Sequence, residues 1–274
     1  MLAPDIREVR RRIVPAVGVL VVSLLASACG SSDGTATPTT SRRRTGSSTS
    51  SSTTTTSSTV TSSTTAPGTD AVLAAPLLPL FPFQTAAEAE AWRTAYRASG
   101  ARPEFADAGR TAVAFAQFLG YTEIDRVVAA RVDTKGAHVS VGALIPDTDR
   151  TSTAAIVHLV RFTTGADAPW VVVGTDDTNF ALTAPAYGRV IHSPLPVGGT
   201  ITGVDESIRV HVQQLHGNGY LGEACCIPAG GQGSRWSGTL TFAPPTDPIL
   251  MVSASTGGHI RGVERFTVNG VRAG

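Results

Sequence analysis

The chain has 274 residues, and its 22 Lys and Arg side chains almost balance 21 Asp and Glu, for a formal net charge of +1. Nucleic-acid-binding domains carry a clustered excess of basic side chains, and the folded part of this sequence has no such cluster. The composition therefore argues against a nucleic-acid partner.

The first 28 residues have the pattern of an export signal. Arg7 and the arginines at 10–12 precede an apolar stretch, residues 13–28, which is short for a membrane span and is interrupted by Pro15 and Gly18. Small residues then precede Cys29. This arrangement resembles the signal of bacterial lipoproteins, in which the cysteine sulfur is lipidated and becomes the new N-terminus.

The resemblance implies removal of residues 1–28, palmitate-type acylation of Cys29, and an anchor at the extracytoplasmic face of the cell membrane. Ala26 stands where the lipoprotein pattern usually has Leu, and residues 26–28 also form an A-x-A site for ordinary signal cleavage. Secretion without a lipid and an uncleaved N-terminal anchor are the two alternatives. All three place the mature chain outside the cytoplasm.

Residues 29–69 comprise this cysteine and a linker rich in Ser and Thr. Residues 47–65 are all Ser or Thr except Val60. Such a run buries too little apolar surface to offset the entropy of ordering its backbone. We expect a disordered tether, and its hydroxyl-rich composition makes it a candidate for O-glycosylation.

Residues 70–183 have the pattern of an α+β domain in which two helices precede an antiparallel sheet. Thr85 and Glu88 have capping-box spacing, and Gly100 ends the helix that they begin. A second helix is predicted from Asp107 as N-cap to Leu119, followed by Gly120. Alternating apolar residues then predict four strands, at 126–132, 138–145, 153–163 and 170–174. This element order resembles the cone-shaped domains of the nuclear transport factor two-like type.

Residues 184–274 have the pattern of an all-β sandwich. Short strands punctuated by Gly and Pro recur every eight to twelve residues. The predicted strands lie at 190–192, 200–204, 207–215, 238–242, 249–253 and 263–268. The segment between 217 and 231 is rich in glycine, and we expect it to form an exposed loop with a hairpin tip near Gly231.

The motif 193–200 (SPLPVGGT), the strand 207–212, Trp236 after a glycine-rich hairpin, and the strands near 239–242 and 249–255 occur in this order. The order is similar to the immunoglobulin-like domain of bacterial spore germination proteins, over about 185–274. The resemblance implies an immunoglobulin-like sandwich and does not imply sporulation. Val204 and Asp205 stand where that family usually has Phe before the Glu, and the pattern has no counterpart of Cys225 and Cys226.

The adjacent cysteines leave three interpretations open. Exported proteins meet an oxidising environment, which favours a disulfide, but neighbouring Cα atoms lie about 3.8 Å apart, below the usual range for a bridge. Buried or partly buried thiols are the second interpretation. An intermolecular bond or a metal role, with His216 as a further ligand, is the third.

Motifs for catalysis are absent from the sequence. No H-E-x-x-H, G-x-S-x-G or phosphate-binding loop occurs. Asp176 and Asp177 close a predicted strand and are expected to be solvated acids. The aromatic residues Trp92, Tyr96, Phe115 and Trp170 have the spacing of core residues, with a ligand cavity as the alternative. We therefore expect no catalytic site, no metal and no cofactor.

These patterns together predict a cell-envelope-anchored, non-catalytic lipoprotein. We expect it to bind an envelope protein or a cell-wall polymer through the immunoglobulin-like domain, with membrane contact through lipid on Cys29. The alternative is an extracytoplasmic carrier of a small ligand that uses a pocket in the α+β domain. Converging polar groups in a pocket would favour ligand binding, whereas a flat sheet edge would favour protein binding.

Overall fold

The computed structural model describes residues 77–133 and 136–274. The predicted signal peptide (1–28), the lipidation site Cys29 and the tether (29–69) lie outside the described residues, so these stay predictions. Among the helices that are described, none is both long and apolar enough to cross a membrane.

Both predicted helices are confirmed, together with their caps. Helix α1 (Ala86–Ser99) begins with the capping box of Thr85 and Glu88, and Gly100 ends it at φ +67°. Helix α2 (Ala108–Phe118) begins at Asp107, whose side chain accepts a hydrogen bond from the amide of Arg110. A short 3₁₀ helix, η1 (Pro103–Ala106), was not predicted and connects the two.

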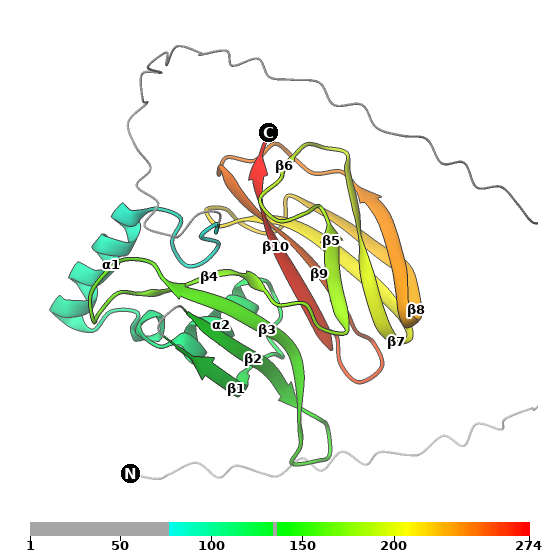
Figure 1. Ribbon diagram of the computed structural model, residues 1–274, viewed down its shortest axis with the longest axis horizontal. Coiled ribbons are helices and arrows are strands. Elements are labelled where there is room, and N and C mark those ends of the chain that lie inside the picture. The colour runs from blue at the N-terminus through cyan, green and yellow to red at the C-terminus, as the bar shows by residue number, and fades with distance from the viewer. Residues whose placement is uncertain (1–76, 134–135) are drawn as a thin grey trace, which may run out of the picture. The chain divides into compact units, whose positions relative to one another are not determined.

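Four antiparallel strands follow in the order β1-β2-β3-β4, as the alternating pattern predicted. Their bounds are β1 (Arg126–Val132), β2 (Ala137–Leu144), β3 (Thr151–Arg161) and β4 (Trp170–Thr175). Helix α2 packs against all four strands (Figure 1). The apolar face of α2 and the inward side chains of the sheet thus form one core.

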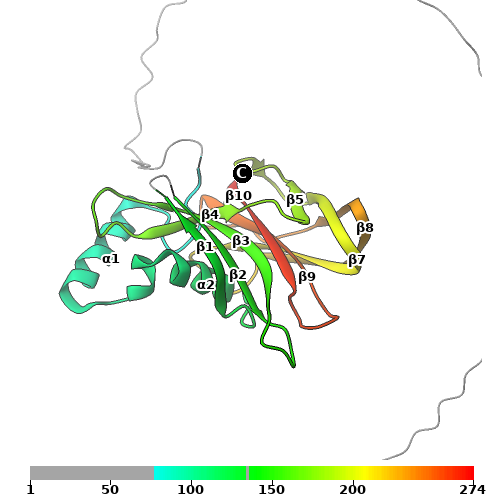
Figure 2. The same ribbon diagram turned by 60° about the horizontal axis from the view of Figure 1, so that its bottom comes forward.

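The second sheet is mixed and curled. Its strands are β5 (Phe180–Ala184), β6 (Val190–Ile191), β7 (Leu195–Gln214), β8 (Gly222–Leu240), β9 (Ile249–Thr256) and β10 (Arg265–Ala273). They lie in the order β5-β7-β9-β10-β6, with β8 paired to β7 and only β6 parallel to its neighbour. Strand β7 pairs with β8 along most of its length. It also pairs with β5 near its start and with β9 near its end, so this one long strand connects β5 to β9 in the sheet (Figure 2).

Two expectations for this half are wrong. The two strands predicted at 200–204 and 207–215 are one long strand, β7, which ends at Gln214. The segment 217–231 is largely strand β8 and not a loop. Strand β8 pairs with β7 along its length, and the pairing register shifts on both sides of Gly203. Hydrogen bonding to a long partner strand therefore outweighs the poor strand propensity of glycine.

The described residues pack in two apolar clusters. One lies within the second sheet, whereas the other joins the helices and first sheet to Met251, Phe266 and Val268 of β9 and β10. Strand β10 lies beside the first sheet in both views (Figures 1 and 2). The predicted division at 183/184 falls within β5. The division into two domains stays a prediction, and side-chain packing crosses it.

Candidate binding site

A polar pocket of about 390 Å³ lies where the end of α2 meets the second sheet. Its volume is within the roughly 300–1,000 Å³ that is typical of small-molecule sites. Buried residues form its floor and exposed residues its rim. The floor includes Tyr121, His211, Ser255 and Thr256, and the rim includes Arg209, Tyr220, Cys225 and Cys226.

Strand alternation brings these side chains together. In β7, Ile208, Val210 and Val212 belong to the apolar cluster of the second sheet, so the intervening Arg209 and His211 belong to the opposite face. The register pairs Arg209 with Ser255 of β9 and His211 with Glu223 of β8. Three neighbouring strands therefore contribute polar groups to one surface.

His211 is the central residue of the floor. It is 3% exposed, and its ring stacks on Tyr220 with centroids 3.7 Å apart and planes 5° from parallel. Among the described residues, neither ring nitrogen has a hydrogen-bond partner, and Nε2 lies 3.7 Å from a Glu223 carboxylate oxygen. Burial lowers the pKa of His211, an effect that Glu223 opposes and Arg209 reinforces. The site thus holds a buried imidazole with unused hydrogen-bonding capacity.

Thr256 has the same property. It is 1% exposed, lines the pocket, and its Oγ1 has no hydrogen-bond partner among the described residues. Tyr121 is also buried, and its hydroxyl donates to Ser253 Oγ at 3.3 Å. Burial raises the pKa of Tyr121 to about 12, so this phenol stays protonated at physiological pH. Buried polar atoms without protein partners are normally satisfied by water or a ligand.

Tyr220 fixes the end of α2 against the second sheet. Its hydroxyl donates to the carbonyl oxygen of Leu119 at 2.8 Å. The next residue, Gly120, has φ +88°, and a Cβ atom there would lie 2.7 Å from the Tyr220 hydroxyl. Both the backbone conformation and this close approach require glycine at position 120. Tyr220 is therefore held in place on both sides, by His211 and by the helix end.

The rim carries one paired charge and the cysteine pair. Arg209 Nη1 lies 3.3 Å from Glu223 Oε1, and Arg209 Nη2 lies 3.5 Å from Cys225 Sγ. Cys225 and Cys226 are joined by a disulfide and both are exposed. The structure therefore has the vicinal disulfide, and not the free thiols or the metal ligands that the sequence left open. The pair lies in strand β8 and not in the loop that the sequence predicted.

We expect the disulfide to contribute little to global stability. A bridge between neighbours closes almost no loop, so the unfolded chain loses little entropy. The double variant Cys225→Ser/Cys226→Ser should lose no more than about 1–2 kcal/mol in the free energy of unfolding. Chemical denaturation with and without reductant measures this. A collapse of the wild-type fold on reduction would show that the bridge holds β8 in place.

Stability should fall as the pH drops below about 6.5, the ordinary histidine pKa. Burial lowers the folded-state pKa values of His211 and of His158. The neighbouring His138 lowers the pKa of His158 further, whereas Asp176 raises it. The unfolded chain then takes up protons at a higher pH than the folded chain, so acid favours unfolding and full stability is present above pH 6.5. Urea unfolding measured from pH 7.5 to 5 gives the free energy of unfolding at each pH. This free energy should fall less steeply with decreasing pH in His211→Phe than in the wild type. An equally steep fall would show that His211 does not cause the acid sensitivity.

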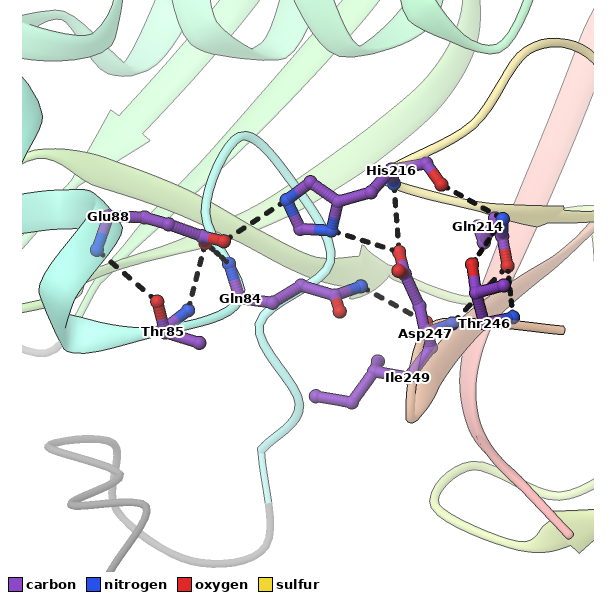
Figure 3. Close-up of polar contacts among 8 residues, drawn as sticks. All are labelled: Gln84, Thr85, Glu88, Gln214, His216, Thr246, Asp247 and Ile249. Carbon is purple, nitrogen blue, oxygen red and sulfur yellow. Dashed lines mark hydrogen bonds and ion pairs between the residues drawn. The ribbon is translucent and has the colours of Figure 1, made fainter.

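A second polar cluster, shown in Figure 3, joins α1 to the second sheet. His216 Nε2 lies 3.1 Å from Glu88 Oε1, and His216 Nδ1 lies 3.1 Å from Asp247 Oδ2. Gln84 also donates to the carbonyl oxygen of Ile249 at 3.0 Å. Carboxylates occupy both nitrogens of His216, so neither is left to take a proton from a hydroxyl or thiol. The cluster connects the two halves of the fold and has no nucleophile–base geometry.

The aromatic residues that the sequence analysis considered as a possible cavity lining are part of the hydrophobic core. Trp92, Phe115 and Trp170 are buried in the first core, and Trp92 stacks on Tyr96 with centroids 5.0 Å apart. These aromatic residues therefore fill space in the core of the α+β half. The pocket described above lies elsewhere.

Asp176 Oδ2 lies 2.6 Å from His138 Nδ1 and accepts its hydrogen bond, and the His138 ring stacks on that of His158. A histidine nitrogen binds a metal ion that lies in the plane of its ring. The rings of His138 and His158 are stacked, so one ion cannot lie in both planes, and this pair is a poor metal site. Across the described part of the chain, no group of three or more His, Cys, Asp or Glu side chains could hold a metal ion. His216 lies with Glu88 and Asp247 and does not line the pocket that contains the cysteine pair.

Sequence reasoning did not identify the pocket. Tyr121, His211, Tyr220 and Thr256 were not singled out, although the alternation Ser207, Arg209, His211, Gln213 marks one polar face of a strand. That signal predicts a face but not what covers it.

Comparison with protein-family models, with curated proteins and with solved structures finds no match to this chain.

Proposed function

We propose that this chain is an exported, non-catalytic binding protein of the cell envelope. Lipid on Cys29 holds it at the extracytoplasmic face of the membrane, and the Ser/Thr-rich tether carries the folded part to its partner. The half that resembles the immunoglobulin-like domain of spore germination proteins presents the binding surface. The partner is an envelope protein or a cell-wall polymer.

The pocket around His211 is the observation that carries this proposal. Side chains from three strands and from the end of α2 converge there, and two of them, His211 and Thr256, are buried with polar atoms that have no hydrogen-bond partner among the described residues. Leaving such atoms without a hydrogen bond costs about 1–3 kcal/mol each. Both side chains line the pocket, so a ligand bound there is the candidate to supply the missing hydrogen bonds.

The chemistry of the pocket supports binding over catalysis. Within the described structure no hydroxyl or thiol is hydrogen-bonded to either nitrogen of His211. The two sulfur atoms at the rim are bonded to each other and so are not thiolate nucleophiles. The site therefore lacks a nucleophile activated by a base.

Co-sedimentation tests the proposal. Full-length protein in detergent is mixed with washed, insoluble envelope fragments and centrifuged. His211→Phe keeps a planar ring for Tyr220 and removes both nitrogens, so it should pellet at least tenfold less. His158→Phe is the matched control, because His158 is also a stacked histidine, half-buried, but lies on the first sheet.

Wild type and His158→Phe should pellet alike. Equal pelleting of His211→Phe would show that another surface binds the envelope. Failure of the wild type to pellet with any envelope fraction would overturn the proposed function.

A further inference from the structure

The lining of the pocket is rich in hydroxyl groups. Tyr121, Ser207, Tyr220, Ser255 and Thr256 carry hydroxyls, and these residues line one small volume. The two phenols already donate their protons, to Ser253 and to the carbonyl oxygen of Leu119, so they offer acceptor lone pairs to a ligand. A hydroxyl has one donor proton and two acceptor lone pairs. A ligand matched to such a surface must itself offer donors and acceptors at short spacing.

His211 contributes a further donor and a further acceptor, and it does so as a neutral group. Its lowered pKa favours the neutral ring, in which one nitrogen donates and the other accepts. Neither nitrogen is hydrogen-bonded by the described residues, and the same holds for Thr256 Oγ1. The floor therefore adds further donor and acceptor capacity without adding charge.

The pocket carries little net charge. Arg209 is the cation among the lining residues, and Glu223 neutralises it at 3.3 Å. A phosphate or carboxylate ligand would have to compete with Glu223 for the guanidinium, and the nearby carboxylate would repel it. A neutral ligand meets no such cost.

The rim provides apolar surface for the non-polar part of such a ligand. Tyr220 is 39% exposed, and the disulfide of Cys225 and Cys226 is exposed beside it. Aromatic rings and polarizable sulfur pack well against C–H groups. A sugar ring combines these two properties, since it has an apolar C–H face and a circle of hydroxyls.

We propose that the His211 pocket binds a neutral saccharide unit, such as a sugar residue of a cell-wall polymer. This inference rests on the proposed function and names the ligand class of the same site. The floor residues His211 and Thr256 exchange hydrogen bonds with sugar hydroxyls. The rim residues Tyr220 and the disulfide contact the ring.

Saturation-transfer NMR and calorimetry on the full chain test the ligand class. The protein is kept in a detergent without a sugar headgroup, because a glycoside detergent would itself compete. The neutral probes are N-acetylglucosamine, galactose and arabinose, and the anionic probes are N-acetylmuramic acid and inorganic phosphate. At least one neutral sugar should bind saturably and show no competition from phosphate.

Two variants check that the pocket is responsible. His211→Phe and Thr256→Val should each weaken binding of that sugar at least tenfold, while His158→Phe should leave it unchanged. Thr256→Val keeps the side-chain shape and removes only the hydroxyl, so it remains informative if His211→Phe folds poorly. Unchanged binding by both variants would overturn the inference, as would tighter binding of the anionic probes.

Envelope pelleting separates this inference from the proposed function. Pelleting that depends on His211 without binding of any neutral sugar overturns the saccharide assignment and leaves the envelope-binding role in place. If the protein neither pellets with envelope fragments nor binds a neutral sugar, the saccharide assignment and the envelope-binding function are both overturned.

Discussion

Replacement of Phe266 by alanine should lower the free energy of unfolding by about 3–5 kcal/mol, and the whole described region should unfold in one transition. Phe266 is 2% exposed and its ring lies 5.1 Å from that of Tyr121, centroid to centroid. It lies on β10 but packs in the core that also contains α2 and the first sheet. Removing it creates a cavity that weakens both halves together.

Urea unfolding measures this with two probes. Far-UV circular dichroism reports the whole fold, and Trp236 fluorescence, with Trp92 and Trp170 replaced by Phe in all variants, reports the second cluster. Phe180→Ala is the matched control, because Phe180 is equally buried but packs only in the second cluster. Both variants should shift one shared transition. Two separate transitions, with Phe266→Ala moving only one, would support two independently folding domains.

Replacement of Cys29 by serine should abolish membrane retention. A thioether-linked lipid cannot form on serine, and the precursor should either accumulate unprocessed or be released. Wild-type protein should partition almost entirely into the detergent phase of a phase-separation assay. A single acyl chain binds membranes only marginally, so stable retention implies two or more chains on Cys29.

Mass spectrometry of the mature N-terminus completes the test of the anchor. The expected species begins at Cys29 and carries acyl mass. Soluble wild-type protein with an unmodified Cys29, or one cleaved after Ala28 without lipid, would contradict the anchor and favour plain secretion.

Local signals predicted the helical half well. Thr85, Glu88 and Asp107 satisfy free amides at helix starts, and these contacts depend only on residues within the next turn. The alternation of β2 and β3 is likewise local, because each of these strands buries part of its side chains, whereas β4 is buried almost throughout and β1 has no buried residue. Helix ends and half-buried strands can be read from sequence since the information lies within a few residues.

The second sheet was harder to predict because its strands depend on their partners. Residues 222–240 contain many glycines and two adjacent cysteines, which favour a loop when considered alone. Pairing along β7 makes them a strand. The pocket was missed for the same reason, since Tyr121 and His211 are 90 positions apart. Only contacts between the end of α2 and the second half of the chain, such as the hydrogen bond from Tyr220 to Leu119, bring them together.

Histidine NMR gives the most direct test that the His211 pocket is the binding site. The chain has six histidines, so selective ¹³C labelling of their Cε1 atoms gives few signals, and His211→Phe identifies the one from the pocket. Solubilised cell-wall glycan fragments should shift the His211 signal saturably while the His158 signal stays in place. An unmoved His211 signal under conditions where the protein binds those fragments would contradict the account.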